Sequence, residues 1–482
     1  MQFNSITFAV FLLIVFFLYW FVFNRSIVRW QNLFLIVVSY VFYGWWDWRF
    51  LILLFISSLS DFIFGYVIYN ESRHKWRKIY LIFSIVINLG MLAYFKYFNF
   101  FIENFIDLFS LFGIQLHANS LNIILPVGIS FYTFQSMTYT IDVYWRKIKP
   151  TRDVIAFFAY LSFFPQLVAG PIERAINFLP QFTKKREFDY SAAVDGMRQI
   201  LWGLFKKIVI ADNCAVFVDS IFSNYTEHSG STLLLGSVLF AFQIYGDFSG
   251  YSDIAIGSAR LFGFNLLQNF RYPYFSTSIT EMWRRWHISL SNWLREYLYT
   301  PIALSTRNWG TFGIIFSSVI TFLLCGLWHG ANWVYVVFGL LHGLALGYEL
   351  LTKKLRKKWN KRIPVKIYYF GSVFLTFVFW NISLIFFHSS SLGDAFAYLN
   401  GIFSNTLFSM PNADTGVNPL TITVLIPIFI MAEWLQKDKI HVLQLDYKKL
   451  PRYIRWIIYV LVVFSIGMLG NTGDVPFIYF QF

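Results

Sequence analysis

Charge is scarce in this sequence. Only 13% of its 482 residues are Asp, Glu, Lys or Arg, whereas about 25% is usual for a soluble globular protein. Hydrophobic residues make up 57% of the chain and are spread along its whole length. This composition excludes an ordinary soluble protein and predicts a single polytopic membrane domain over residues 1–482.

Cysteine and several reactive motifs are also scarce or missing. The two cysteines, Cys214 and Cys325, lie far apart in apolar stretches, without CxxC or Cys/His zinc spacing. Neither a disulfide framework nor a zinc site is therefore expected. His342 follows His329 without HExxH-like spacing, so we expect no bound metal. The serines of HISLSNW do not form a GxSxG elbow, which argues against a serine triad.

Long apolar runs are abundant. A membrane-spanning helix needs about 20 apolar residues, and on that basis we expect an all-α fold of about 11–13 transmembrane helices around a central chamber. The first run lacks the basic region and cleavage site of a signal peptide, so we expect it to be retained. The twelve candidate spans are 6–23, 31–46, 49–69, 79–97, 121–141, 197–222, 233–256, 311–327, 331–351, 367–388, 419–435 and 454–470.

Two segments depart from the pattern of simple spans. Residues 153–169 are apolar but lead into PQLVAGPIER, whose Pro and Gly predict a broken or re-entrant helix. Residues 260–307 carry six arginines among Trp, Tyr and Pro, which is too polar for a lipid-facing span. We expect amphipathic helices there, at the cytoplasmic interface or entering a polar cavity. Ser278, with Glu281 three residues later, predicts a helix start.

The distribution of basic residues orients the chain. The net charge is +14, but the basic residues form short clusters between apolar runs, which is typical of the positive-inside rule and not of a nucleic-acid-binding surface. The clusters at 71–78, 184–186 and 353–362 should be cytoplasmic. The intervals 97–145, 214–259 and 389–436 contain no Lys or Arg and should include the outward loops. Both termini are then expected outside.

Two histidines are the candidates for chemistry. His329 lies in GLWHGANW near the end of an apolar run, and His287 lies in MWRRWHISLSNW. An ionisable side chain at membrane depth is costly and usually functional, although a hydrogen-bonded structural role is the alternative, more so for His287. A neutral histidine can accept a proton from an attacking hydroxyl, and a second polar group can stabilise the developing oxyanion. Sequence spacing alone does not place the two together.

Other polar residues in apolar surroundings are candidates for the chamber wall. Asp247 and Asp253 fall in QIYGDFSGYSDIAIG, where buried carboxylates need partners, and a structural network is the favoured reading for both. Trp328 and Asn332 flank the histidine of GLWHGANW and are expected to line the chamber. Asp142 lies near an inner boundary, where a structural role is expected.

These stretches resemble the membrane-bound O-acyltransferase superfamily, and most of all its bacterial branch that acetylates alginate and related cell-envelope polysaccharides. The resemblance covers much of the chain from residue 125 onward, whereas the first 120 residues match mainly in hydropathy. It is carried by LPVGISFYTFQSMTYTIDVYWRK (125–147), FFPQLVAGPIER (163–174), the long stretch from QIYGDFSG to WLREYLYTPI (243–302), LLCGLWHGANWVYVVFGLLHG (323–343) and PFIYFQF (476–482).

The resemblance implies an enzyme that transfers acyl groups within the membrane. The family's catalytic histidine falls on His329, and a second position, often Asn, Asp or His in relatives, falls on His287. Arg284, Arg285 and Trp286 are then candidates for binding the donor, because arginine binds phosphate well. Membrane anchoring of the two arginines is the alternative. Relatives often carry Arg where this chain has His388, which puts an ion pair there in doubt.

The resemblance also implies partners and a place. The donor is expected to be cytosolic acetyl-CoA, with no bound cofactor, and the acetyl group is expected to pass outward to a polysaccharide. The expected partners are membrane lipid and an extracytoplasmic protein like the SGNH hydrolases, with no nucleic acid. The expected location is the bacterial plasma (inner) membrane. Whether His329 acts as a base or carries the acyl group is left open.

Several alternatives are left open by the motifs. Peptidoglycan O-acetylation and D-alanyl transfer to teichoic acid are rivals within the same enzyme class. A transporter or channel would also use intramembrane polar residues, but no inverted repeat is evident. An assembly scaffold gives no reason to bury a histidine at membrane depth.

Overall fold

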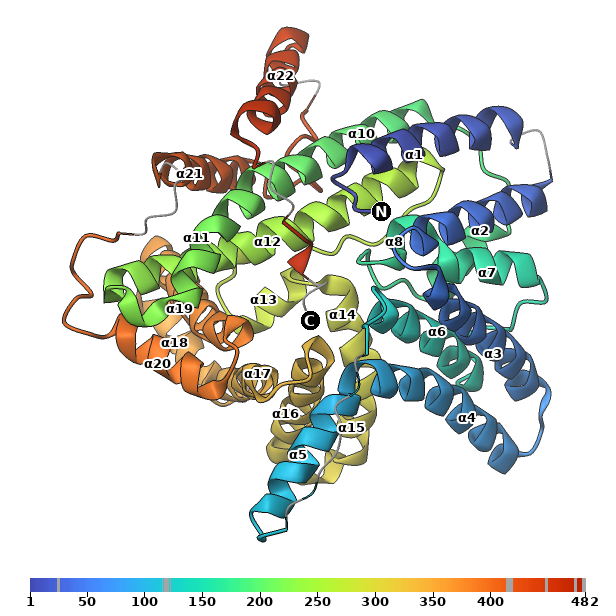
Figure 1. Ribbon diagram of the computed structural model, residues 1–482, viewed down its shortest axis with the longest axis horizontal. Helices are drawn as coiled ribbons and strands as arrows, with labels where there is room; N and C mark the ends of the chain where they lie inside the picture. The colour runs from blue at the N-terminus through green and yellow to red at the C-terminus, as the bar shows by residue number, and fades with distance from the viewer. Residues whose placement is uncertain are drawn as a thin grey trace. The chain divides into compact units, whose positions relative to one another are not determined.

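The computed structural model describes residues 1–23, 27–114, 116, 121, 123–412, 419–446, 450–471 and 475–478. Over this part of the chain the protein consists of helices and their connections, without a β-strand (Figure 1), which confirms the expected all-α class. The chain divides into two compact units. The first comprises Met1–Ile200 and Ile254–Leu267, and the second comprises Leu201–Asp253 and Gln268–Phe482.

Most helices belong wholly to one unit. Those of the first unit are α1 (Ile6–Phe17), α2 (Val28–Gly44), α3 (Leu51–Asn70), α4 (His74–Leu92), α5 (Phe98–Ser110), α6 (Ile129–Tyr144), α7 (Val154–Ser162), α8 (Phe164–Leu167) and α9 (Ala175–Phe178). The second unit contains α11 (Asp212–Ser223), α13 (Ile279–Arg285), α14 (Ile288–Leu294), α15 (Thr300–Ser305), α16 (Gly310–His329), α17 (Trp333–Leu351), α18 (Lys353–Arg362), α19 (Val365–His388), α20 (Leu392–Ile402), α21 (Pro419–Leu435) and α22 (Arg452–Leu469). Two helices contribute residues to both units, α10 (Tyr190–Leu204) and α12 (Gly230–Leu261).

Seven helices in the described part of the chain are long and apolar enough to cross a membrane, which agrees with a multi-pass protein. They are Trp48–Asn70, His74–Ser110, Gly230–Leu261, Arg307–His329, Trp333–Leu351, Val365–His388 and Arg452–Leu469. Each falls on one of the twelve expected ranges. The other five ranges are helical but shorter or more polar. In the range 121–141, for example, the helix begins only at Ile129, after Pro126 and Gly128.

The interruption expected within 153–169 is confirmed. Helix α7 ends at Ser162, and the four-residue helix α8 follows with Pro165 at its start. Phe163 between them has an extended ψ of 110°, which stops the first helix. Proline lacks an N–H and suits the first turn of a helix, so the chain restarts rather than continues.

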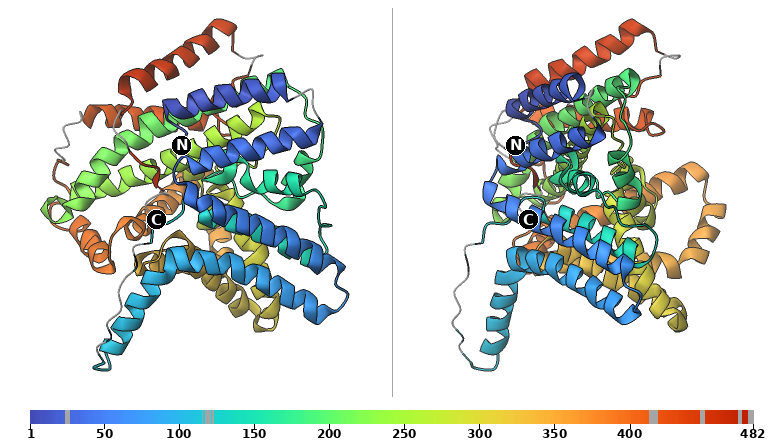
Figure 2. Two further views of the ribbon diagram at one scale, coloured as in Figure 1. Left: turned by 45° about the vertical axis from the view of Figure 1, so that its right-hand side comes forward. Right: turned by 90° about the vertical axis from the view of Figure 1, so that its right-hand side faces the viewer.

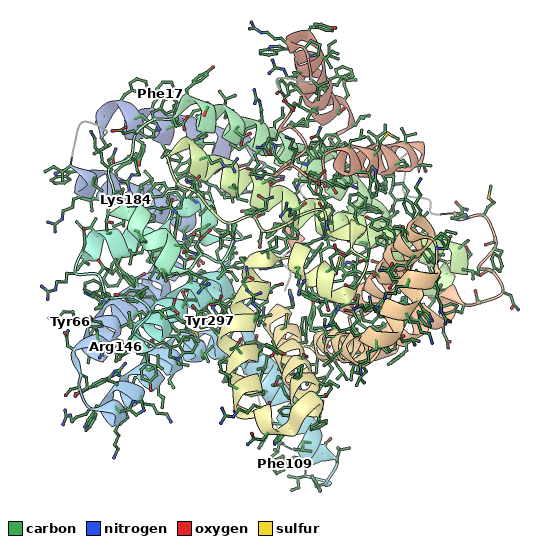
Figure 3. The ribbon with its side chains drawn as sticks, turned by 180° about the vertical axis from the view of Figure 1, so that it is seen from behind. Phe17, Tyr66, Phe109, Arg146, Lys184 and Tyr297 are labelled. Atoms are coloured by element: carbon green, nitrogen blue, oxygen red, sulfur yellow. The ribbon has the colours of Figure 1, made fainter. Side chains whose placement is uncertain are left out.

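Polar contacts hold together three helices of the first unit, α3, α4 and α6. Asp61 of α3 is fully buried and accepts hydrogen bonds from the Ser84 hydroxyl (2.6 Å), the Asn88 amide (2.8 Å) and the Ser136 hydroxyl. Such interhelical hydrogen bonds substitute for the hydrophobic driving force that lipid cannot supply. Helix α5 continues beyond α4 and points away from these three helices (Figure 2), and Phe109 marks its far end (Figure 3).

The arginine-rich segment 260–307 forms short helices, and much of it is buried. Trp283, Trp286 and Trp293 are each at most 5% exposed. Of the two expected arrangements, this burial favours helices that enter the protein interior over helices that lie on its surface. The expected helix start is confirmed, because the Ser278 hydroxyl accepts from the Glu281 N–H at 3.1 Å and caps α13.

Candidate active site

The hairpin of α16 and α17 carries His329. Helix α16 ends at His329, and a short turn leads into α17, which lies beside it (Figure 1). The two helices approach closely at glycines. A Cβ atom at Gly326 would lie 2.0 Å from the carbonyl oxygen of Tyr335, and one at Gly330 would lie 2.1 Å from the Tyr335 ring. Small residues allow this backbone-to-backbone packing, so the glycines around the WHG motif determine where His329 lies on its hairpin.

Aromatic rings surround His329. The residue is 4% exposed, and its ring centroid lies 4.9 Å from Trp328, 5.2 Å from Phe387 and 6.0 Å from Phe338. Phe387 belongs to α19 and Phe338 to α17, so three helices of the second unit contribute to this enclosure. The packing restricts the imidazole to a narrow range of orientations, as a catalytic group requires.

His287 lies in the segment between the membrane spans α12 and α16 and has an unusual backbone. It adopts the left-handed conformation, with φ 43° and ψ 54°, and it precedes α14 as the N-cap. Its Nδ1 atom accepts a hydrogen bond from the Leu290 N–H at 3.2 Å. Non-glycine residues in this conformation are uncommon and often mark functional sites.

The hydrogen bond at Nδ1 determines which nitrogen of His287 carries the proton. Burial lowers the pKa of His287 to about 3, so the ring is neutral near pH 7. A neutral imidazole whose Nδ1 accepts a hydrogen bond carries its proton on Nε2. His287 therefore offers an N–H donor rather than a basic nitrogen.

The structure brings His287 and His329 into one neighbourhood. The Trp328 ring packs edge-on against His287 at 6.0 Å and contacts His329 at 4.9 Å. Phe248 of α12 also packs against His287, at 4.7 Å. The two histidines, 42 positions apart in the sequence, thus share the indole of Trp328 as a neighbour.

A basic cavity of about 640 Å³ lies next to His287 in the second unit. Ile288 and Trp283, on either side of His287 in the sequence, both line it. Four cationic side chains also line it: Arg284, Arg295, Lys353 and Arg356. Hydroxyl side chains also line it, from Ser278, Thr280, Ser291, Ser318 and Thr321, and the last four already donate to acceptors of the protein. Such a mixture of cations, hydroxyls and apolar wall suits a phosphate-bearing ligand.

Glu349 is the carboxylate of this cavity, and it has structural partners. It accepts hydrogen bonds from the Ile279 N–H (2.7 Å), the Thr280 N–H (3.1 Å) and the Thr280 hydroxyl (2.6 Å) at the start of α13. Arg356 lies 3.5 Å from it. Glu349 thus ties the end of α17 to α13, and the cavity keeps an excess of positive charge.

The expected donor-binding residues divide into two groups. Arg284 is exposed and lines the basic cavity. Arg285 pairs with Glu281 at 2.7 Å, and Trp286 is 3% exposed and packs on Trp380 at 4.9 Å. Neither of these two is among the residues that line the cavity.

The two expected chamber carboxylates are engaged in buried ion pairs of the second unit. Asp253 lies 2.6 Å from Lys206, and Asp247 lies 2.8 Å from Lys207. Asp247 also accepts from the Ile478 N–H at 2.7 Å, which ties the described part of the C-terminal motif to α12. The rest of that motif, residues 479–482, lies outside the described residues. These buried pairs agree with the structural role favoured from the sequence, although the lysine partners were not among the residues expected.

Asn332, expected in the chamber wall, caps a helix. Its side-chain oxygen accepts from the Val334 N–H at 3.1 Å, which makes it the N-cap of α17, and its amide donates to the Ser390 carbonyl at 3.0 Å. His342, about three turns further along α17, is also held by neighbours, the Trp283 indole (3.3 Å) and the Ser383 hydroxyl (3.1 Å).

Sequence reasoning missed three of the four cations of the cavity. Lys353 and Arg356 were interpreted only as part of a cytoplasmic cluster, and Arg295 only as part of an arginine-rich segment. Helical spacing gave no signal for Arg295, because α13 ends at Arg285 and the left-handed His287 separates it from α14. The contribution from α18 depends on packing and has no counterpart in the local sequence.

Comparison with known proteins identifies the class of protein that carries this site. Residues 146–391, just over half of the chain, match the model of the membrane-bound O-acyltransferase family. The protein belongs to the membrane-bound O-acyltransferase family. The matched segment includes His287, His329 and all the residues that line the basic cavity.

Individual relatives give this membership more detail. "Probable alginate O-acetylase AlgI" of Pseudomonas aeruginosa is 41% identical over 322 residues, which are 67% of this chain and 61% of that protein. The peptidoglycan O-acetyltransferase of Helicobacter pylori is 33% identical over 397 residues, 77% of this chain and 73% of that protein. The teichoic acid D-alanyltransferase of Bacillus subtilis is 26% identical over 262 residues, 52% of this chain and 64% of that protein. The chain thus spans less than two thirds of the alginate O-acetylase that it matches.

Proposed function

We propose that this protein is a membrane O-acetyltransferase that takes an acetyl group from a donor on its basic side and passes it outward for O-acetylation of a polysaccharide. One observation carries the proposal. His287 and His329 both contact Trp328, and the residues beside His287 line a cavity with four cations. The match to the acyltransferase family supports this reading.

Acetyl-CoA is the donor that fits the basic cavity. Its phosphates match the guanidinium and ammonium groups of Arg284, Arg295, Lys353 and Arg356. Its pantetheine arm suits the apolar wall formed by Ile314, Ile315, Phe322 and Leu346. In this proposal the thioester end of the arm lies toward Ile288, the lining residue that follows His287 in the sequence.

The two histidines take different roles in this proposal. His329 acts as general base and removes the proton from the attacking hydroxyl, whose oxygen bonds to the acetyl carbon. His287 donates from Nε2 to the carbonyl oxygen as negative charge develops there. The C–S bond of the thioester then breaks, and the proton passes from His329 to the CoA sulfur.

Both units are proposed to act as one acyltransferase domain, since residues 146–391 include parts of each. Basic clusters place the donor side in the cytoplasm and both termini outside the plasma membrane of a bacterium. An extracytoplasmic partner like the SGNH hydrolases is proposed to assist delivery to the polymer.

The acceptor is proposed to be a cell-envelope polysaccharide, as in the alginate O-acetylases. Peptidoglycan is a second candidate, because the relative named for it aligns over 73% of its own length, against 61% for the alginate O-acetylase of Pseudomonas aeruginosa. D-Alanyl transfer to teichoic acid ranks below both, at 26% identity over 52% of the chain.

Donor turnover by the purified protein tests the proposal. Radiolabelled acetyl-CoA is given to wild type, His329→Ala and the control His74→Ala, with and without the extracytoplasmic partner. His74 is an exposed histidine remote in sequence from the site. We expect His329→Ala to lose turnover by about 10²–10⁴-fold, the usual contribution of general base catalysis. Wild-type turnover in folded His329→Ala would contradict the catalytic role.

Two further outcomes separate the alternatives. Solute transport in liposomes without any acyl donor would favour a transporter. If the protein turns over a carrier-bound acyl group but not acetyl-CoA, the proposed donor is wrong and the proposed class of enzyme still holds.

A further inference from the structure

A second, smaller cavity of the second unit is built from different chemistry. It has a volume of about 290 Å³ and lies where α11, the turn η6 (Tyr225–Glu227), the end of α19 and the start of α20 meet. We call it the hydroxyl pocket. Its lining residues are Phe222, Ser223, Tyr225, His388, Ser389, Ser390, Asp394 and Tyr398. Its volume is close to the lower end of the usual range for ligand sites, about 300–1,000 Å³, which suits one small ring.

The hydroxyl pocket is linked to His329 through α19 and through Asn332. Phe387 packs on His329 at 5.2 Å, and the next residue in the chain, His388, lines the pocket. The Asn332 amide, three residues beyond His329, donates to the Ser390 carbonyl at 3.0 Å. The pocket therefore lies at the end of α16 that holds His329, whereas Ile314, Ile315 and Ser318, nearer the start of α16, line the basic cavity. The whole of α16 is about 30 Å long.

Aromatic rings form one part of the pocket. Phe222 lies between His388 and Tyr398, with ring centroids at 4.1 Å and 4.3 Å and interplanar angles of 23° and 17°. Phe240 packs edge-on against His388 at 4.5 Å and holds it from another side. The stack keeps these rings fixed, so binding costs little side-chain entropy. Rigid aromatic rings with polar tips suit a ligand that has both C–H faces and hydroxyl groups.

Hydrogen-bonding groups form the other part, and the charge among them is negative. The Asp394 carboxylate accepts from the Tyr225 hydroxyl at 3.0 Å and from the Ser391 hydroxyl at 2.7 Å. A carboxylate has about four acceptor positions, so Asp394 retains acceptor capacity for a ligand hydroxyl. No Lys or Arg is among the residues that line the pocket. The stretches 214–259 and 389–436, which supply nearly all of the lining, contain no Lys or Arg at all.

We propose that the hydroxyl pocket is a recognition subsite for one uncharged sugar unit of the acceptor, which it holds beside His329, and that it disfavours uronate units. Sugar hydroxyls donate to Asp394 and bond to the serines, while the ring face lies on the aromatic stack. A ligand carboxylate would meet Asp394 without a compensating cation, a like-charge contact that selects against it. This assignment rests on the proposed acetyltransferase function and narrows its acceptor to a polysaccharide with uncharged units, which disfavours a polyuronate such as alginate.

A binding experiment without any acyl donor tests the subsite. Wild-type protein in detergent is titrated with N,N′-diacetylchitobiose and with a mannuronate disaccharide, and saturation-transfer NMR measures each affinity. We expect the uncharged disaccharide to bind at least about tenfold more tightly, the effect of one charge-assisted hydrogen bond gained or lost. Equal or tighter binding of the mannuronate would overturn the proposal.

Two variants locate the binding. Asp394→Asn keeps the size of the side chain, and Ser390→Lys adds a cation at an exposed lining position. Both should weaken diacetylchitobiose binding by about tenfold, and Ser390→Lys should strengthen mannuronate binding. The control Asn400→Lys places the same charge on an exposed site of α20 outside the pocket and should change neither affinity.

Unchanged diacetylchitobiose binding in both pocket variants would overturn the assignment, and so would displacement of the sugar by a serine-containing peptide of a protein acceptor. Donor turnover is measured on the same preparations. His329-dependent turnover without sugar discrimination would refute the subsite alone. Sugar discrimination without any turnover would refute the proposed function instead.

Discussion

The basic cavity and the hydroxyl pocket differ in charge although a single helix, α17, reaches both. Near the end of α17, Glu349 lines the basic cavity, which has four cations. At the start of α17, the Asn332 amide donates to the carbonyl of Ser390, which lines the hydroxyl pocket. That pocket has one carboxylate and no cation among its lining residues. Under the proposed function, this difference in charge would sort a polyanionic donor from an uncharged acceptor before any chemistry occurs. The contrast teaches that two cavities of opposite charge lie at opposite ends of the same helices, as two different proposed substrates would require.

After His329→Ala, loss of the His287 side chain should have the largest effect. His287→Ala loses the Nε2–H donor, and we expect acetyl transfer to fall by about 10²–10³-fold, as for other oxyanion donors. His287→Asn should retain part of the activity, because asparagine accepts the left-handed backbone, caps α14 and still offers an amide N–H. Steady-state kcat for acetyl transfer measures both variants. Equal losses in the two would contradict a donor role.

The pH dependence of the same variants is a second check on His287. Because burial lowers its pKa to about 3, His287 stays neutral from pH 5 to pH 8. The wild-type and His287→Asn activity profiles should therefore have the same shape over that range, differing only in height. The unfolded chain binds a proton near pH 6.5 whereas the folded chain does not, so wild type should lose thermal stability relative to His287→Asn as pH falls below about 6.5. A shift of the acidic side of the pH–activity profile in His287→Asn would contradict the neutral state of His287 in this range.

Substitutions of the cations that line the basic cavity should have the next largest effect. Arg284→Ala and Lys353→Ala should each raise the KM for acetyl-CoA by about tenfold with little change in kcat, since each removes a charge-assisted contact to phosphate. Lys354→Ala is the matched control, an exposed lysine on the same helix that does not line the cavity. KM in rising salt provides a second readout, because screening weakens these contacts in wild type. A change in Lys354→Ala as large as that in Lys353→Ala would place the donor elsewhere.

Variants at the two ends of α17 should have the smallest effects, and each should change the properties of one end only. Asn332→Ala removes the helix cap and should lower stability by about 1 kcal/mol, whereas Asn332→Ser keeps a cap but loses the bond to Ser390. We expect the serine variant to affect acceptor binding and leave the KM for acetyl-CoA unchanged. Glu349→Gln should lower the melting temperature slightly while leaving acceptor binding unchanged. Thermal unfolding measures the stability of each variant, and acceptor affinity and the KM for acetyl-CoA measure the two binding functions. An altered acceptor affinity in Glu349→Gln would mean that the two ends of α17 do not act independently.

Local features of the fold could be predicted from the sequence because they depend on neighbouring residues. The cap at Ser278 and the break after Ser162 follow from residue types a few positions apart. The spans that form α16, α17 and α19 follow from long apolar runs. Expected spans such as 197–222 are less simple, because Lys206 and Lys207 lie within the apolar run and pair with Asp253 and Asp247 of another helix.

The site was harder to predict because it depends on contacts between distant segments. Sequence reasoning proposed His287 and His329 but had no means to place them around Trp328. Arg285 and Trp286 share the sequence context of Arg284, yet a helical turn directs neighbours to different sides, and only Arg284 lines the cavity. Arg356 and Lys353 reach the cavity only because α17 and α18 pack where they do.

The left-handed backbone of His287 also bears on how such a site evolves. With φ at 43°, most side chains would be strained at this position, and besides glycine the residues that tolerate it best are asparagine, aspartate and histidine. The main-chain conformation thus limits which side chains can occupy position 287 without strain. Substitutions that would change the chemistry there are restricted by the backbone as well as by their effect on activity.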